Sequence, residues 1–289
     1  MITSLHRIAQ LGVGALFATS LLGCDGGEAA SSSDEFNLTD LGLSEAESTV
    51  SSFDVTTGAA IQGSLTCAPQ PTQAFVFGDS IAACYGVSEE VCAVGAIADR
   101  LDGVPTTNLA EGGSVTADIA AQIQSAEPED GHALVVIQVI GNDLTPFIIY
   151  SDEQSLEEIG GLQAEVLQIW NEDIFPALED KFSDGYTLVM NTQYNPFECT
   201  LGAVKDQLIL ETDDLLIGIA EEHASTTVIA NAHPAWVGHG NGFENTECAT
   251  HDPEYEGWMA DVIHPNEVGH AYLGLLWVDA LDFLSSDCR

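Results

Sequence analysis

The stretch that most constrains the fold is His132 to Ile140, an almost unbroken run of β-branched and other apolar residues. A strand that is apolar at successive positions, and not only at alternate ones, is buried on both faces. Strands of this kind belong to parallel sheets that carry helices on both sides. The run ends abruptly in the polar turn Gly141-Asn-Asp143. It therefore predicts a doubly covered strand of a parallel α/β domain.

Four further strands and five helices are expected to alternate with this run. The strands are 74–77, 105–110, 186–194 and 226–232, and the helices are about 91–101, 116–124, 155–181, 204–222 and 266–284. Gly160-Gly161 and Pro176 are expected to bend or divide the long helix, and 233–263 is expected to be a long loop. The alternation predicts a three-layer α/β/α sandwich around a five-stranded parallel sheet.

The charge balance is strongly acidic, with 5 Lys+Arg against 46 Asp+Glu and a formal net charge of −41. Nucleic acid and anionic bilayer surfaces should repel such a chain, so we expect no nucleic-acid partner. A solvated acidic surface is favoured over a specific cation-binding role, and a saline environment would screen the self-repulsion.

The N-terminus has the pattern of a targeting segment. Arg7 precedes an uncharged apolar run that is too short to span a bilayer, and the run ends in Leu21-Leu-Gly-Cys24. This ending resembles a bacterial lipobox, in which the chain is cleaved before the Cys and the thiol receives a lipid. We expect a lipoprotein signal peptide over 1–23, an acidic Ser/Thr/Gly-rich spacer over 24–71 and one domain over 72–289. An ordinary signal peptide with an incidental Cys is the alternative.

Cysteine usage is consistent with export to an oxidising compartment. Of the 7 cysteines, assigning Cys24 to the lipid leaves six, an even number that allows fifteen pairings. Local spacing favours Cys84 with Cys92. Cys199 with Cys248 would then join two loops, and Cys67 with Cys288 would join the start of the domain to its end.

The stretch Ala74-Phe-Val-Phe-Gly-Asp-Ser80 is a short buried strand followed by a sharp break. A serine there lies at the carboxyl edge of a parallel sheet, where ligands bind and where the amides of the next helix can face an oxyanion. Ser80 is therefore a candidate nucleophile, although Gly-Asp-Ser is also a common turn composition.

A serine nucleophile needs a base, a group that orients the base and donors for the oxyanion. Asp261 and His264 are three residues apart, just ahead of the last helix, so the carboxylate can reach Nδ1 of the imidazole and leave Nε2 for Ser80. The donors can come from the backbone N–H groups of Ser80 and Gly113 and from the side-chain amide of Asn142.

Four ordered blocks resemble those of the SGNH/GDSL hydrolase family. They are Gly78-Asp-Ser80, Asn108-Leu-Ala-Glu-Gly-Gly113, Gly141-Asn-Asp143 and Asp261-Val-Ile-His264. The resemblance implies a flavodoxin-like sheet and acyl-ester hydrolysis through Ser80, with Gly113 and Asn142 in the oxyanion hole and no metal or organic cofactor. Two segments, 194–197 and 233–240, further resemble the lipase-like branch. Glu111, beside the oxyanion glycine, has no evident place in the pattern.

Several other polar residues have simpler interpretations. We interpret Asp79 as a carboxylate that stabilises its turn, and Asp143 as a brace for its loop. His239, His251 and His270 could compete for the base role, yet none has an Asp three residues earlier. A metal site built from His233, His239 and His251 with a carboxylate is a further alternative to their being polar loop residues.

Three functions remain open at this point. The leading one is a monomeric carboxylic-ester hydrolase, anchored in the cell envelope through Cys24 and acting on small-molecule or lipid esters with short to medium acyl chains. The second is a carbohydrate O-acetyl esterase of the same fold, because 234–260 offers aromatic residues for stacking on sugars: Trp236, Phe243, Tyr255 and Trp258. The third is a non-catalytic envelope lipoprotein, which would have no need of the catalytic residue types.

Overall fold

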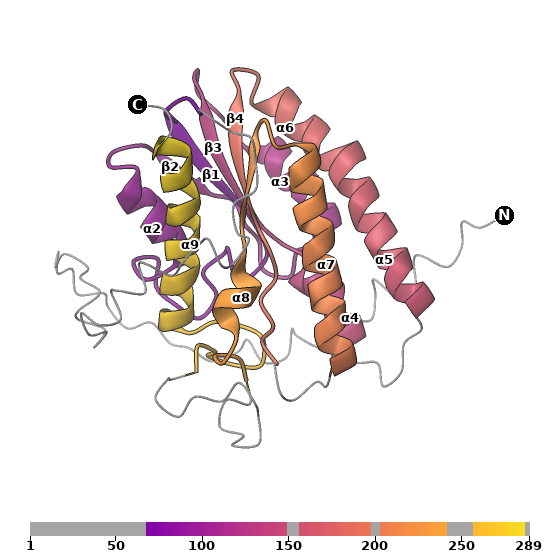
Figure 1. The fold of residues 1–289 in the computed structure, drawn as a ribbon. Coiled ribbons are helices and arrows are strands. Elements are labelled where there is room, and N and C mark those ends of the chain that lie inside the picture. The colour runs from indigo at the N-terminus through magenta and orange to yellow at the C-terminus, as the bar shows by residue number, and fades with distance from the viewer. Residues whose placement is uncertain (1–67, 149–155, 198–202, 242–256, 287–289) are drawn as a thin grey trace, which may run out of the picture. The chain divides into compact units, whose positions relative to one another are not determined.

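The described part of the chain is built around one parallel β-sheet. A computed structural model describes residues 68–148, 156–197, 203–241 and 257–286. Its sheet has five parallel strands in the order β2-β1-β3-β4-β5 (Figure 1), which confirms the predicted sheet. The strands are β1 (Gln73–Gly78), β2 (Thr106–Asn108), β3 (Ala133–Gln138), β4 (Tyr186–Asn191) and β5 (Thr227–Ala230).

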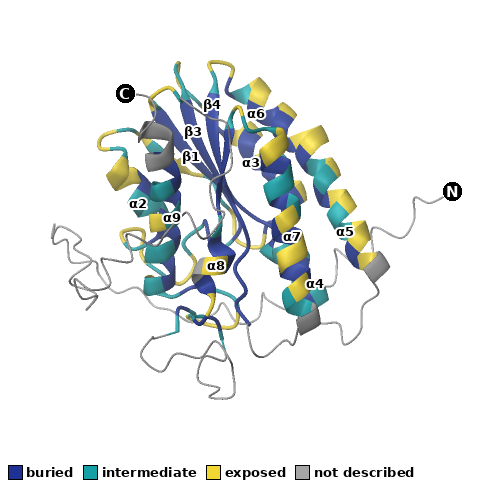
Figure 2. Cartoon of the chain, in the orientation of Figure 1, coloured by how far each residue is buried: buried dark blue, intermediate teal, exposed yellow. Residues whose placement is uncertain are grey.

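Burial differs between the interior strands and the edge strand β2. Every residue of β1, β3 and β4 is buried (Figure 2). The Thr-Thr-Asn sequence of β2 is partly or fully exposed. The strands are in matching register: Val76 of β1 pairs with Val136 of β3 on one side and with Asn108 of β2 on the other. The apolar runs therefore form the middle of the sheet, as expected of strands covered on both faces.

Successive residues of β1 point into different hydrophobic clusters. Phe75 and Phe77 belong to a cluster with α3 (Ile119–Ser125), α4 (Gly141–Ile148), α5 (Leu156–Ile169), α6 (Phe175–Lys181) and α7 (Ala203–Glu222). Ala74 and Val76 belong to a second cluster with α2 (Ala93–Arg100), α8 (Ala232–Trp236) and α9 (Glu267–Ser286). Because side chains alternate across a strand, the two clusters lie on opposite faces. The predicted three-layer α/β/α sandwich is confirmed (Figure 1).

The long helix predicted over 155–181 divides at only one of the two expected places. Helix α5 runs through Gly160 and Gly161 without a break, so the glycine pair does not divide the helix. A π-helical segment, Trp170–Ile174, separates α5 from α6, and the Phe175 N–H bonds to the Trp170 carbonyl five residues earlier. Pro176 follows directly. Since proline has no N–H to continue an α-helical ladder, the irregular turn falls beside it.

Two short helices occupy stretches that were expected to be turn or loop. Helix α4 begins at the Gly-Asn-Asp turn and contains Pro146, and α8 lies at the start of the 233–263 loop. A three-residue 3-10 turn, Thr116–Asp118, precedes α3. None of the helices in the described ranges is long and apolar enough to cross a membrane.

Several predicted features lie outside the described residues. They are the signal peptide, all but the last residues of the spacer, and the cysteines Cys24, Cys67, Cys199, Cys248 and Cys288.

Candidate active site

The strand order creates a crevice between β1 and β3. The chain passes from β1 to β2 on one side and then to β3 on the other, so the two connections leave the sheet in opposite directions. In open α/β sheets, ligands bind outside the carboxyl ends of the strands at such a switch point. Ser80 follows β1, Gly113 follows β2 and Asn142 follows β3. The three polar turns therefore meet at one edge.

The turn after β1 is fixed by its backbone and by Asp79. Gly78 has a φ of +151°, and a Cβ there would lie 2.0 Å from the carbonyl oxygen of Gln138, so only glycine fits. The Asp79 N–H donates to that carbonyl at 3.1 Å, and Oδ1 of Asp79 accepts the N–H of Ile81 at 2.9 Å. Asp79 thus stabilises its turn, as interpreted from the sequence. Burial raises the pKa of its carboxyl to about 7.

Ser80, His264 and Asp261 form a continuous chain of hydrogen bonds. Nε2 of His264 lies 3.0 Å from Oγ of Ser80, although the two residues are 184 positions apart in the sequence. Nδ1 of the same ring lies 3.0 Å and 2.8 Å from the two carboxylate oxygens of Asp261. The structure therefore brings together all three residues that the sequence singled out, each within hydrogen-bonding distance of the next.

The Asp261 carboxylate also organises the turn that carries His264. Its Oδ1 accepts the backbone N–H groups of Ile263 and His264 at 2.9 and 2.8 Å. Burial alone would raise the pKa of Asp261, but these two hydrogen bonds and the nearby imidazole outweigh burial, so the pKa lies below its ordinary value. Asp261 is therefore held as a carboxylate beside the ring.

Two side chains from elsewhere in the fold hold this turn in place. The Asn241 amide donates to the carbonyls of Asp261 and Val262 at 3.1 and 2.7 Å. The Tyr194 hydroxyl donates to the carbonyl of Ile263 at 2.6 Å. Both contacts satisfy backbone carbonyls that a loop would otherwise leave to water.

Aromatic side chains pack beneath the turn. Tyr194 stacks on Trp236 with ring centroids 4.2 Å apart, and Trp236 meets Trp258 edge-on at 5.1 Å. Both tryptophans are buried, so the expectation that Trp236 and Trp258 could stack on sugars is wrong: their faces are used in the core. Phe243 and Tyr255 lie outside the described residues.

Three N–H groups at or near Ser80 are candidates for the oxyanion donors. A Cβ on Gly112 would lie 3.9 Å from the Cβ of Ser80, which places the 111–113 turn against the serine. Gly113 has a φ of +87°, in the left-handed region that favours glycine. Within the described part of the chain, the backbone N–H groups of Ser80 and Gly113 have no hydrogen-bond acceptor. One N–H of the Asn142 amide donates to the Ser114 carbonyl at 2.9 Å, and its second N–H remains for a ligand.

Gln122 is a site residue that the sequence analysis did not identify. Its side chain accepts the N–H of Gly78 and donates to the carbonyl of Gly78, both at 2.8 Å, and it donates to Oγ of Ser114 at 2.9 Å. It therefore joins the strand before Ser80 to the turn after Gly113. Gln122 lies between the apolar residues Ala121 and Ile123, but Gln124 is also a glutamine, so the sequence carried no distinct signal for it.

Asp143 and Glu111 lie at the margins of the site. The Asp143 carboxylate accepts the N–H and the hydroxyl of Thr116 at 3.0 Å each, so it braces the start of α4 as interpreted. Burial raises the pKa of Asp143 to about 6. The Glu111 N–H donates to the Gly78 carbonyl at 3.1 Å and its side chain is exposed, so its contribution to the turn is through the backbone.

The other histidines in the described residues that were considered for the base role or a metal site lie in buried or stacked positions, and none of them forms a hydrogen bond to Ser80 there. His270 is fully buried on α9, and burial lowers its pKa to about 4. His233 pairs with Asp213 at 3.0 Å, and His239 stacks on Trp258 at 3.6 Å. His251 lies outside the described residues, and no group of three metal-ligating side chains occurs within them.

A pocket opens beside Ser80 on the side of α4. Its polar lining includes Asp79, Ser80, Asn142, Thr145, Gln193 and His264, and its apolar lining includes Leu144, Ile148, Pro196, Phe197, Ile209 and Ile263. A hydroxyl flanked by an imidazole and by N–H donors at the mouth of an apolar pocket can attack a carbonyl carbon and stabilise the resulting oxyanion.

This combination of sheet, switch point and polar residues is typical of hydrolases that act through a serine. The model of the GDSL-like lipase/acylhydrolase family matches residues 75–277. The chain belongs to this family. No curated protein matches it.

Solved structures with a similar fold have low sequence identity to the chain. The lipase Lip_vut3 from a goat rumen metagenome is 19% identical, with a TM-score of 0.55 over 72% of this chain and 96% of its own. The acetyl xylan esterase AlAXEase is 14% identical, with a TM-score of 0.51 over 72% and 99%. The extracellular lipase from Streptomyces rimosus is 16% identical, with a TM-score of 0.50 over 72% and 99%. At these identities the similarity concerns the fold alone.

Proposed function

We propose that the protein is a carboxylic-ester hydrolase that cleaves short- to medium-chain acyl esters through an acyl-enzyme on Ser80. The observation that carries this proposal is the 3.0 Å contact between Nε2 of His264 and Oγ of Ser80, with Asp261 at the other ring nitrogen. Membership of the hydrolase family supports the reaction class.

The proposed reaction has two halves. Oγ of Ser80 attacks the ester carbonyl carbon while Nε2 of His264 takes the hydroxyl proton, and Asp261 stabilises the imidazolium that forms. The oxyanion of the tetrahedral intermediate accepts the N–H groups of Ser80 and Gly113 and one N–H of the Asn142 amide. The intermediate collapses as His264 protonates the departing alcohol. Water then attacks the acyl-enzyme, His264 takes the water proton, and the carboxylic acid leaves as Ser80 regains its proton.

The apolar pocket beside Ser80 supports the acyl preference. Leu144, Ile148, Phe197 and Ile209 offer a hydrocarbon surface next to the proposed oxyanion donors. Each methylene that the pocket buries contributes about 0.8 kcal/mol, so kcat/KM should rise over the first few carbons and then level off where the chain leaves the pocket.

A fluorophosphonate probe and a panel of aryl esters test this function. Wild-type protein should be labelled on Ser80 and should hydrolyse aryl esters, and Ser80→Ala should lose both properties. Ser88→Ala is the matched control, because Ser88 is an exposed serine in the following loop. Turnover that persists in Ser80→Ala would place the nucleophile elsewhere. Acetylated sugars belong in the same panel, since activity confined to acetyl groups on sugars would favour the carbohydrate esterase.

We further propose that the mature protein is a monomer anchored to the bacterial cell envelope through a lipid on Cys24. The apolar run that ends in Leu21-Leu-Gly-Cys24 supports this location. Mass spectrometry of the detergent-extracted protein should find an acylated N-terminal Cys24. An unmodified N-terminus at another residue would make it a plain secreted protein.

A further inference from the structure

An exposed tyrosine lies against the imidazole of His264. The ring centroids of Tyr85 and His264 are 4.3 Å apart, with the planes inclined by 38°. Tyr85 is 51% exposed, so burial in the core does not explain its position. The ring nitrogens of His264 are engaged by Asp261 and Ser80, and Tyr85 supplies an aromatic contact to the ring itself. A histidine that gains charge beside an aromatic face is stabilised as a cation.

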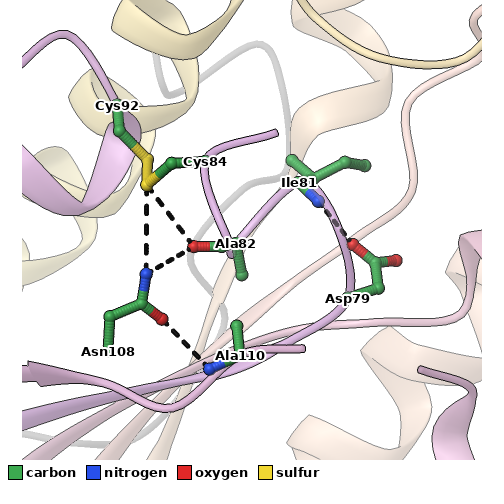
Figure 3. The surroundings of a disulfide bond; sticks show 7 residues. All are labelled: Asp79, Ile81, Ala82, Cys84, Cys92, Asn108 and Ala110. Atoms are coloured by element: carbon green, nitrogen blue, oxygen red, sulfur yellow. Dashed lines mark hydrogen bonds between the residues drawn. A yellow bond between two sulfur atoms is a disulfide. The ribbon is translucent and has the colours of Figure 1, made fainter. Parts of the chain in front are cut away.

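Hydrogen bonds and a disulfide fix the loop that carries Tyr85. The Tyr85 N–H donates to the Ser80 carbonyl at 2.9 Å. Cys84, the preceding residue, has a φ of +63°, which is uncommon outside glycine, and forms the disulfide with Cys92 that the spacing predicted (Figure 3). The Asn108 amide donates to the Ala82 carbonyl at 2.8 Å, next to the disulfide sulfur of Cys84.

The disulfide also links this loop to the helices behind His264. Cys92 is the N-cap of α2. Helix α2 packs closely on α9, since a Cβ on Gly274 of α9 would lie 2.7 Å from the Cβ of Ala96. Helix α9 begins three residues after His264. Tyr85 is therefore connected to α2 through the neighbouring disulfide, and His264 is connected to α9 through the chain. Both residues are attached to the same pair of packed helices.

We propose that Tyr85, held by the Cys84–Cys92 disulfide, is a positioning residue that keeps the His264 imidazole directed at Ser80 and stabilises its protonated form during the reaction. This inference rests on the proposed ester hydrolysis. The ring blocks rotation of the imidazole out of the line between Asp261 and Ser80. Its π face also lies where positive charge develops when His264 accepts the Ser80 proton.

Kinetics of full-length Tyr85 variants test this role. Tyr85→Ala should lower kcat about tenfold with little change in KM, because a displaced base affects the transition state more than substrate binding. The pH midpoint of kcat/KM should also fall by about 0.5 unit as the aromatic contact with the imidazolium is lost. The titratable groups Asp261, His270 and Asp79 around the ring are unchanged in this variant.

Two substitutions separate the aromatic face from simple bulk. Tyr85→Phe keeps the ring and should retain wild-type kcat and pH midpoint, whereas Tyr85→Leu keeps apolar volume and should show the lower pH midpoint. The control is Leu275→Ala, which truncates an exposed apolar residue on α9. Wild-type kcat and pH midpoint in Tyr85→Ala, or equal losses in Tyr85→Phe and Tyr85→Ala, would overturn the proposal.

The disulfide is tested by Cys84→Ala combined with Cys92→Ala. This double variant should lose kcat to a similar extent as Tyr85→Ala, and adding Tyr85→Ala to it should cause little further loss, because both changes remove one interaction. Full additivity would show that the disulfide does not act through Tyr85. Failure of the ester-hydrolase proposal itself would be distinguishable, since wild-type protein would then show neither turnover nor labelling of Ser80.

Discussion

His264 and His233 each pair through Nδ1 with an aspartate, but their surroundings differ. The His264 side chain is 15% exposed and that of Asp261 45%, and Nε2 of His264 faces the Ser80 hydroxyl. The side chains of His233 and Asp213 are 10% and 5% exposed, and Nε2 of His233 faces a second carboxylate, that of Asp206, at 3.9 Å. The chemical role proposed for the His264 pair thus depends on what its outer nitrogen faces: Ser80 in this pair, and a carboxylate in the His233 pair.

The two aspartates also differ in electrostatics. Burial raises the pKa of Asp213 to about 6, although hydrogen bonds from the His233 ring and the Gln193 N–H oppose that shift. Asp261 is less buried, and its hydrogen bonds bring its pKa below the ordinary value. Asp261 is therefore suited to stabilising an imidazolium at neutral pH, whereas the Asp213 pair connects α7 to the segments after β4 and β5.

Among the variants that compare the two pairs, the largest expected effect is that of Asp261→Asn on turnover. An amide in place of the carboxylate would favour the wrong imidazole tautomer and would not stabilise the imidazolium, so kcat should fall by about 10⁴. Steady-state kinetics together with circular dichroism would check this. A kcat near the wild-type value in a folded variant would show that the carboxylate of Asp261, like that of Asp213, is not needed for turnover.

Asn142→Ala should have the next largest effect, because it removes one of the proposed oxyanion donors beside Ser80. Removing one such donor should lower kcat by about 10²–10³ while the melting temperature changes little. An equal loss of folded protein and of activity would instead assign Asn142 a structural role, through its hydrogen bond to the Ser114 carbonyl.

Asp213→Ala should affect stability and leave catalysis intact. It would leave the Gln193 N–H and the His233 ring without their buried partner, which should lower the free energy of unfolding by about 2 kcal/mol. Urea unfolding measures the loss, and titration of active sites with a fluorophosphonate probe normalises kcat to folded protein. A large fall in kcat per active site would show that the buried pair also acts on the reaction.

The smallest expected effect is on the pH dependence of stability, where the two aspartates contribute with opposite sign. The raised pKa of Asp213 means that the folded state keeps a proton that the unfolded chain loses above about pH 4. Its contribution to stability is therefore present at low pH and declines as pH rises to about 6. The lowered pKa of Asp261 gives a contribution that is present above its ordinary pKa of 3.8 and is lost as pH falls.

Unfolding free energies measured between pH 4 and pH 6 should separate these contributions. In Asp213→Asn the decline with pH should be less steep than in wild-type protein by about 1 kcal/mol per pH unit. Asp261→Asn should leave the slope between pH 4 and pH 6 nearly unchanged, because the Asp261 contribution is lost only as pH falls below the ordinary pKa of 3.8. If the unfolding free energy changed equally with pH in wild-type protein and in Asp213→Asn, this result would contradict the raised pKa of the Asp213 carboxyl.

The parts of the site that sequence predicts are those set by local pattern. Asp261 and His264 are three residues apart, and Ser80 and Asn142 each follow an apolar strand, so spacing and strand order were enough to bring them to one edge. The same logic predicted the sheet and the layers, because buried strands have nearly continuous apolar runs.

The parts that sequence did not predict depend on partners far along the chain. Gln122 bonds to Gly78 across 44 residues, and Tyr85 meets His264 only after both ends of the domain have folded. Trp236 was expected to be available to ligand because its segment resembles a loop, yet tertiary packing places it at 0% exposure. No single-segment pattern encodes these contacts.

The 184 residues between Ser80 and His264 have a consequence for how activity arises during synthesis. At about 5–20 residues per second, a ribosome needs about 10–40 seconds to add the histidine after the serine. Throughout that interval the nascent chain holds a serine without its base. Ester cleavage by the proposed mechanism begins only when the last helix docks. Incomplete or truncated copies of the protein should therefore not hydrolyse esters.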